Sequence, residues 1–204
     1  MGSTVGTALV IAVIAYLVGS IPSAYIVGRL VSGVDIRVAG EGNVGARNAY
    51  HVVGHGWGVA VCLLDAAKGG AVAVALRDRP TWQLMLGGVA VIAGHGFPMW
   101  LGFVGGKGVA TASGFGIALF LPAAVLGGAS AGAVFAVTRR FLPTLVVAIV
   151  GTLAAAMLLG EGAITLGIVV SLFALTGVKR ALDEPRMREI EATTGWDRAA
   201  GGTT

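Results

Sequence analysis

Apolar runs separated by short polar segments divide this chain of 204 residues along its length. A helix needs roughly 20 apolar residues to cross a bilayer, and most of the runs lie near that length. The runs occupy residues 4–30, 56–76, 82–93, 109–137, 142–159 and 163–178. The pattern therefore predicts an all-α polytopic membrane protein, with Pro22 kinking the first helix.

The run at 109–137 decides the predicted topology. It is too long for one span unless strongly tilted, and Pro122 lies near its middle, so we divide it into a short fourth segment and a fifth span. About seven transmembrane segments result, and they place four polar stretches on one side: the loop 32–54, the loop 97–108, Arg139-Arg140 and the tail that begins at Lys179-Arg180. The positive-inside rule makes this side cytoplasmic and the N-terminus external. A second topology, with five spans, would leave Arg139-Arg140 outside.

Composition agrees with a membrane protein. Hydrophobic residues make up 56% of the chain and charged residues only 12%, whereas soluble domains carry about 25% charged residues. The net charge of +4 fits basic residues that face anionic lipid. The single cysteine, Cys62, excludes an internal disulfide and argues against a thiolate metal site. We find no nucleic-acid-binding motif.

A glycine-rich stretch, GHGFPMWLGFVGGKGVAT at 94–111, interrupts the apolar pattern. Successive backbone N–H groups in such a loop can form an anion-binding concavity, and Lys107 adds a point charge. A helix predicted to begin after Gly108 would aim its positive dipole end at the same spot. Glycines also permit close helix packing, which we favour for Gly94 and Gly96. Packing does not require a lysine, so Gly105-Gly106-Lys107-Gly108 is predicted to bind phosphate.

A second glycine-rich loop, at 40–48, is predicted to share the cytoplasmic face. Arg37, Arg47, His51 and Lys107 could converge on one anion, although a solvated basic loop explains Arg37 equally well. Within the apolar runs, Asp65 and Lys68 are expected to pair, and intramembrane charges are also functional candidates. His95 is expected to be a structural hydrogen-bonding group rather than a base.

No motif for a covalent nucleophile is present. The sequence lacks G-x-S-x-G and H-E-x-x-H, and it has no histidine and cysteine cluster, so we expect neither a metal nor a cofactor. An anion site without a nucleophile suits direct transfer, in which the protein contributes positioning and electrostatics.

The motifs GSIPSAY, DIR, GxGNxGAxN, LLDxxKG and GHxFPxxxxFxGGKGVAT follow one another from Gly19 to Thr111. In this respect the chain resembles the bacterial, membrane-integral acyl-phosphate:glycerol-3-phosphate acyltransferase family. The resemblance implies a multi-pass protein of the plasma (inner) membrane that moves a fatty acyl group from acyl phosphate to glycerol 3-phosphate, giving lysophosphatidate for phospholipid biosynthesis. It also suggests a transmembrane acyltransferase-like domain at 1–180 and a polar cytoplasmic tail at 181–204.

The resemblance places Gly42, Asn43, Gly45 and Asn48 in a phosphate-cradling loop, and Gly105 to Gly108 at the glycerol 3-phosphate site. The candidate catalytic residues are Lys107, Arg47 and His51. The candidate substrate-binding residues are Ser23, Arg37, Gly40, Glu41, Gly42, Asn43, Gly45, Asn48, Asp65, Lys68, His95, Gly105, Gly106 and Gly108.

Several positions depart from the family pattern, including Val104, where the family has Lys before GGKG. The first loop of the family reads GSGNxGATNxxR, and here its Ser, Thr and Arg are Glu41, Arg47 and His51. The third family motif is missing, with Gly177 where Asn is usual. A carboxylate at Glu41 repels a phosphate unless it is paired or protonated; Arg47 either pairs with it or replaces the missing Arg. Two interpretations stand: an acyltransferase with a rearranged anion site, or a silent paralogue that binds a phosphorylated lipid or assists another membrane enzyme.

Overall fold

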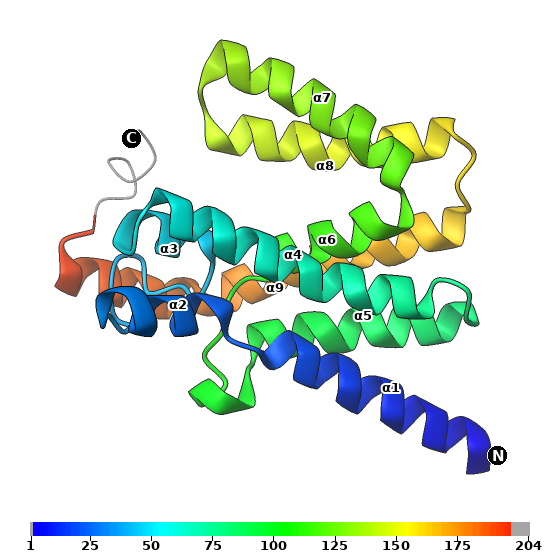
Figure 1. Cartoon of the computed structure of the whole chain (residues 1–204), viewed down its shortest axis with the longest axis horizontal. Helices are drawn as coiled ribbons and strands as arrows, with labels where there is room; N and C mark the ends of the chain where they lie inside the picture. The colour runs from blue at the N-terminus through cyan, green and yellow to red at the C-terminus, as the bar shows by residue number, and fades with distance from the viewer. Residues whose placement is uncertain (1, 197–204) are drawn as a thin grey trace.

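The structure, a computed structural model, describes residues 2–196, and every regular element in that range is helical. Figure 1 shows the helices as one assembly, with α7 and α8 lying side by side along one flank. The elements are α1 (Gly2–Ser20), α2 (Ser23–Ser32), α3 (Ala46–Val52), α4 (His55–Leu76), α5 (Thr81–Gly96), the short 3₁₀ helix η1 (Met99–Leu101), α6 (Val109–Leu119), α7 (Leu121–Thr138), α8 (Phe141–Leu158) and α9 (Ala163–Thr194). The all-α prediction is confirmed.

Five helical segments in the described range are long and apolar enough to cross a bilayer: Thr4–Ser32, His55–Leu76, Thr81–Leu101, Leu121–Thr138 and Ala163–Thr194. Two shorter apolar helices, Val109–Leu119 and Leu142–Leu158, match the remaining predicted segments. Large apolar side chains such as Val137 and Leu158 are exposed, as expected for surfaces that face lipid. How many segments cross the membrane, and in which direction, stays a prediction.

Two breaks in the helices lie at the prolines that the sequence singled out. Pro22 separates α1 from α2, so the predicted kink is a complete interruption. The carbonyl of Ile21, at the break, accepts hydrogen bonds from the Ser23 N–H at 3.0 Å and from Lys68 Nζ at 2.6 Å. The long run at 109–137 divides at Phe120, and Pro122 occupies the first turn of α7, where a missing N–H costs nothing.

Close contact between helices relies on glycine. A Cβ atom at Gly19 or Gly94 would overlap the carbonyl oxygen of Val91 or Tyr16, so α1 and α5 touch backbone to backbone. Gly69 and Gly114 let α4 and α6 approach each other in the same way. The packing role expected for Gly94 is therefore confirmed, and small residues at helix interfaces are the usual device for close packing in membranes.

The predicted polar tail is part of the helical core up to Thr194. Helix α9 runs through residue 180 without a break, and its polar half buries Lys179, Asp183 and Met187. These residues recur every four positions, so they form one stripe along the helix. Residues 197–204 of the predicted tail lie outside the described residues. Helix α3 likewise gives regular structure to part of the predicted loop 32–54.

Candidate functional site

The two glycine-rich loops meet in space. We call residues 40–45 the first glycine loop and residues 105–108 the second. A Cβ atom at Gly106 would lie 2.6 Å from the carbonyl oxygen of Val44 and would overlap the His95 ring. The Gly106 N–H donates to the His95 carbonyl at 3.1 Å, so this amide faces the protein rather than a ligand. The predicted row of anion-binding amides is therefore interrupted at Gly106.

Backbone geometry explains other glycines of these loops. Gly40 and Gly42 have φ angles of +61° and +68°, and Gly108, which precedes α6, has φ +84°. L-residues with side chains rarely adopt this left-handed conformation. Gly105 is needed for another reason, because a Cβ there would overlap the His95 carbonyl and Pro98. Gly45 caps α3 in an extended conformation.

Asn48 organises the first glycine loop from the inside. Its side chain is fully buried, and its amide nitrogen donates to the carbonyls of Ala39, Asn43 and Ile36 at 2.9 to 3.1 Å. Its amide oxygen accepts the N–H of Glu41 at 3.1 Å. Because these bonds already engage both ends of the amide, Asn48 shapes the loop and its contribution to phosphate binding is indirect.

A charged cluster joins the two loops. Glu41 is only 2% exposed, and its carboxylate oxygens lie 3.7 Å from Lys107 Nζ and 3.8 Å from Arg47 Nη1. Of the two alternatives for Arg47, pairing with Glu41 is the one that the structure contains. Two cations therefore surround one buried carboxylate, which leaves a net positive charge. Glu41 Oε1 has no hydrogen bond among the described residues, although it is buried.

Arg37 and His51 contribute less to this cluster than predicted. Arg37 turns to Asp35, with bonds of 2.7 and 3.0 Å, and the Arg37 guanidinium lowers the pKa of Asp35 to about 2. His51 lies edge-on to the rings of Tyr50 and Trp196. Burial, helped by the nearby charge of Arg47, lowers the pKa of His51 below its usual range. His51 is therefore neutral at pH 7 and adds no positive charge there.

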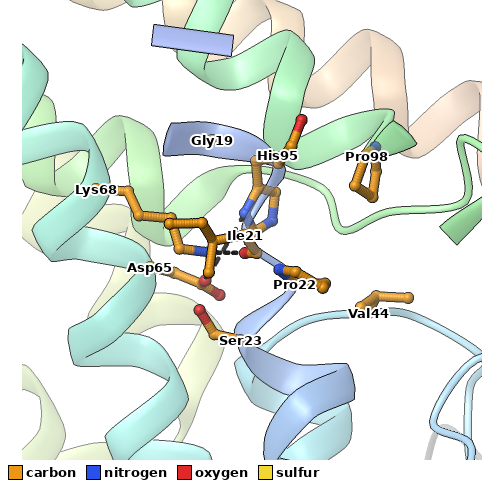
Figure 2. A pocket seen from close by; sticks show the side chains of 10 residues that line it. Gly19, Ile21, Pro22, Ser23, Val44, Asp65, Lys68, His95 and Pro98 are labelled. Atoms are coloured by element: carbon orange, nitrogen blue, oxygen red, sulfur yellow. Dashed lines mark hydrogen bonds and ion pairs between the residues drawn. The ribbon is translucent and has the colours of Figure 1, made fainter. Parts of the chain in front are cut away.

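A small polar pocket lies beside the first glycine loop, where α1 breaks (Figure 2). Lys68 donates to Asp65 at 2.6 Å, which confirms the predicted pair, and His95 lies 3.3 Å from Thr111 Oγ1, which confirms its hydrogen-bonding role. The cavity volume is about 10 Å³, room for about one water molecule. The residues that line it are Gly19, Ser20, Ile21, Pro22, Ser23, Val44, Asp65, Lys68, His95 and Pro98. The volume of this pocket does not accommodate glycerol 3-phosphate, and the substrate-binding role expected for Ser23, Asp65, Lys68 and His95 stays a prediction.

Helix α9 contacts the second glycine loop through Thr176, beside Gly108, and the first through its polar half, which the apolar and polar pattern did not indicate. Lys179 pairs with Asp183 at 2.5 Å and lies over the Phe97 ring, and its side chain covers Gly96. Arg186 donates to the Gly42 carbonyl at 3.2 Å. Thr194 donates to the Gly40 carbonyl at 3.1 Å. The helical spacing of Thr176, Lys179, Asp183, Met187 and Ile190 was the available signal.

The arrangement can hold and orient an anion. It offers Lys107 and Arg47 as charge-assisted donors at the meeting point of two tightly turned loops. Among residues 2–196 we find no group of three His, Cys, Asp or Glu side chains that could hold a metal ion.

Comparison with known proteins places this site in a family. The family model described as glycerol-3-phosphate acyltransferase matches residues 9–184, which is most of the chain. The chain belongs to this family. Glycerol-3-phosphate acyltransferase 4 of Dehalococcoides mccartyi is 43% identical over 82 residues, which cover 39% of this chain and 44% of the relative. The glycerol-3-phosphate acyltransferase of Chlorobaculum parvum is 52% identical over 68 residues, which cover 33% of this chain and 29% of the relative. These alignments thus span less than half of either relative.

Solved structures of the family match over much more of the chain. The crystal structure of PlsY (YgiH), an integral membrane glycerol 3-phosphate acyltransferase in its glycerol 3-phosphate form, has a TM-score of 0.74 and 31% identity. The similarity covers 89% of this chain and 92% of that one. The lysophosphatidic acid form of the same enzyme gives a TM-score of 0.72 and 30% identity. The polytopic membrane fold of the family is therefore shared from near one end of the chain to near the other.

Proposed function

We propose that this chain is an integral-membrane acyltransferase that moves a fatty acyl group from acyl phosphate to glycerol 3-phosphate, giving lysophosphatidate and phosphate. The observation that carries the proposal is the cluster of Lys107 and Arg47 around Glu41, where the two glycine loops of this family's fold meet. We further propose a bacterial plasma membrane as its location, with both loops on the cytoplasmic side.

The reaction needs positioning and charge from the protein more than it needs a nucleophile. The 1-hydroxyl oxygen of glycerol 3-phosphate bonds to the acyl carbonyl carbon, and the bond from that carbon to the bridging phosphate oxygen breaks. The electron pair and the hydroxyl proton leave with the phosphate. Lys107 and Arg47 would bind phosphoryl oxygens and stabilise the charge that develops on the leaving group. Asn48 and the glycines would hold both cations in place.

The deciding experiment measures phosphate release from acyl phosphate by the purified protein, with and without glycerol 3-phosphate, together with formation of lysophosphatidate. We expect release that depends on the acceptor. Lys107→Ala should reduce turnover or substrate affinity roughly ten- to a hundredfold, because a charge-assisted bond contributes about 1.5–3 kcal/mol. Arg79→Ala, an exposed arginine in the turn between α4 and α5, serves as the control and should match the wild type.

Two results would contradict the proposal. Absence of lysophosphatidate, with the protein folded and supplied with both substrates, would favour the silent paralogue. Unchanged kinetics in Lys107→Ala would remove the anion site from the second glycine loop even if the protein is active.

A further inference from the structure

Helix α9 lies across both glycine loops with its polar half. Thr176 lies beside Gly108 of the second loop, whereas Ile190 lies against Gly42 of the first, so the stretch between them faces the place where the loops meet. Arg186 is on this stretch, one turn before Ile190. A Cβ atom at Gly42 would lie 2.5 Å from Ile190 Cδ1, which shows how closely the helix and the loop fit.

Of the two terminal guanidinium nitrogens of Arg186, one has a hydrogen-bond partner and the other has none among the described residues. Its Nη1 donates to the Gly42 carbonyl at 3.2 Å, which fixes the guanidinium beside the first glycine loop. Its Nη2 is buried and has no hydrogen-bond partner among the described residues. Buried polar groups almost always have partners, and an unmet charged donor is costly. A buried guanidinium nitrogen with an unmet donor, beside the loop whose Glu41 faces two other cations, is suited to an anionic oxygen.

Two acidic residues close to Arg186 on α9 already pair with other cations. Asp183 accepts the ammonium of Lys179 at 2.5 Å, and Glu184 accepts Arg188 Nε at 3.0 Å. Glu41, on the neighbouring loop, faces Lys107 and Arg47. Asp183, Glu184 and Glu41 therefore have cations of their own, and Arg186 Nη2 keeps a donor for a ligand.

We propose that Arg186 is a third phosphate-binding cation of this site, delivered to the first glycine loop by α9. This inference rests on the proposed function for the identity of the ligand, which would be a phosphoryl group of glycerol 3-phosphate or of acyl phosphate. A planar guanidinium group suits phosphate because two of its N–H groups can donate to two phosphate oxygens. In Arg186, one nitrogen donates to the Gly42 carbonyl and the other would donate to the ligand. Arg186 would then offset part of the negative charge that Glu41 brings into the site.

Two variants of Arg186 separate the effect of its charge from the effect of its hydrogen bond to the Gly42 carbonyl. Arg186→Gln keeps a donor for the Gly42 carbonyl and removes the charge, whereas Arg186→Lys keeps the charge. Arg188→Gln, on the exposed side of α9, is the matched control. We expect Arg186→Gln to raise the KM for one phosphorylated substrate about tenfold or more, with Arg186→Lys recovering part of the loss and Arg188→Gln unchanged. A rise confined to glycerol 3-phosphate or to acyl phosphate identifies which phosphoryl group Arg186 contacts.

Binding of inorganic phosphate tests the inference without relying on turnover. At matched ionic strength, phosphate should raise the Tm of the wild type and of Arg188→Gln relative to chloride, and it should raise the Tm of Arg186→Gln much less. If this pattern appears without acyl transfer, the anion site stands and the proposed function fails. Equal protection of Arg186→Gln and the wild type would overturn the inference. So would a loss of Tm in Arg186→Gln with unchanged KM and unchanged protection, since that result assigns Arg186 a purely structural role.

Discussion

The carboxylate of Glu41 lies 3.7 Å from the ammonium of Lys107, although the two residues come from different glycine loops. A buried carboxylate is tolerated only when cations or hydrogen bonds compensate its lost hydration. Lys107 and Arg47 provide that compensation, so the same two cations that suit a substrate phosphate already serve an internal anion. A bound phosphate would have to share them with Glu41. This arrangement distinguishes the chain from the family pattern, which has Ser at that position.

Asn48 should matter for stability more than its neighbour Asn43. Replacing Asn48 with Ala leaves buried carbonyls of Ile36, Ala39 and Asn43 without their donor. We expect the free energy of unfolding to fall by about 1–3 kcal/mol or more, as is usual when buried hydrogen-bonding groups lose a partner. Thermal unfolding in detergent measures the effect. Asn43→Ala is the control, because its buried Oδ1 has no bond among the described residues to lose, and an equal effect in both variants would contradict the assignment.

The ion pairs that Asp35 forms with Arg29 and Arg37 should make the stability of the protein sensitive to acid. The Arg37 guanidinium, with a smaller effect of Arg29, lowers the pKa of Asp35 from 3.8 to about 2 in the folded protein. A carboxyl whose pKa is lowered by folding stabilises the protein above its unfolded pKa and loses that contribution as the pH falls through the folded one. The Tm difference between the wild type and Asp35→Asn should therefore be constant above pH 4 and shrink toward pH 2. A difference independent of pH would show that the pair contributes nothing.

Much of the fold follows from the sequence because a bilayer imposes long apolar helices, and Pro22 and Pro122 marked where they break. The Asp65–Lys68 pair was also predictable, since residues three apart share a helix face. The contact between Glu41 and Lys107 depends on how two loops pack, which no local pattern encodes. The polar composition of the second half of α9 predicts a solvated tail. In the structure one stripe of this half, with Lys179, Asp183 and Met187, is buried, and the composition alone does not show it.

The topology remains a prediction that chemical labelling can test. Single cysteines at Ser32, Arg77 and Arg140, in a Cys62→Ala background, would be exposed to a membrane-impermeant thiol reagent. With both glycine loops facing the cytoplasm, Arg77→Cys should react in intact cells, whereas Ser32→Cys and Arg140→Cys should react only after lysis. The predicted cytoplasmic C-terminus, which lies outside the described residues, can be probed with Thr204→Cys. Labelling of Arg140→Cys but not Ser32→Cys in intact cells would support five spans instead of seven.

The last prediction concerns Arg47 and its partner. The Glu41 carboxylate lies between two cations. It is 3.8 Å from Arg47 Nη1 and 3.7 Å from Lys107 Nζ. Without Arg47, the charge of Lys107 is balanced by Glu41, and among the described residues of this cluster the proposed contribution of Arg186 is the only net positive charge left for a phosphate.

Arg47→Ala should therefore weaken binding of glycerol 3-phosphate beyond detection, and adding Glu41→Ser should recover part of it by freeing Lys107. Because each residue acts through the same small cluster, the effects of the two substitutions should couple by about 0.5–3 kcal/mol in a double-mutant cycle. Direct binding measurements on the four proteins give that coupling, and a stability measurement on each shows that all are folded. Strictly additive losses would mean that Glu41 and Arg47 act independently of a phosphate. In that case the anion site has been abandoned, and the silent paralogue becomes the better description of this chain.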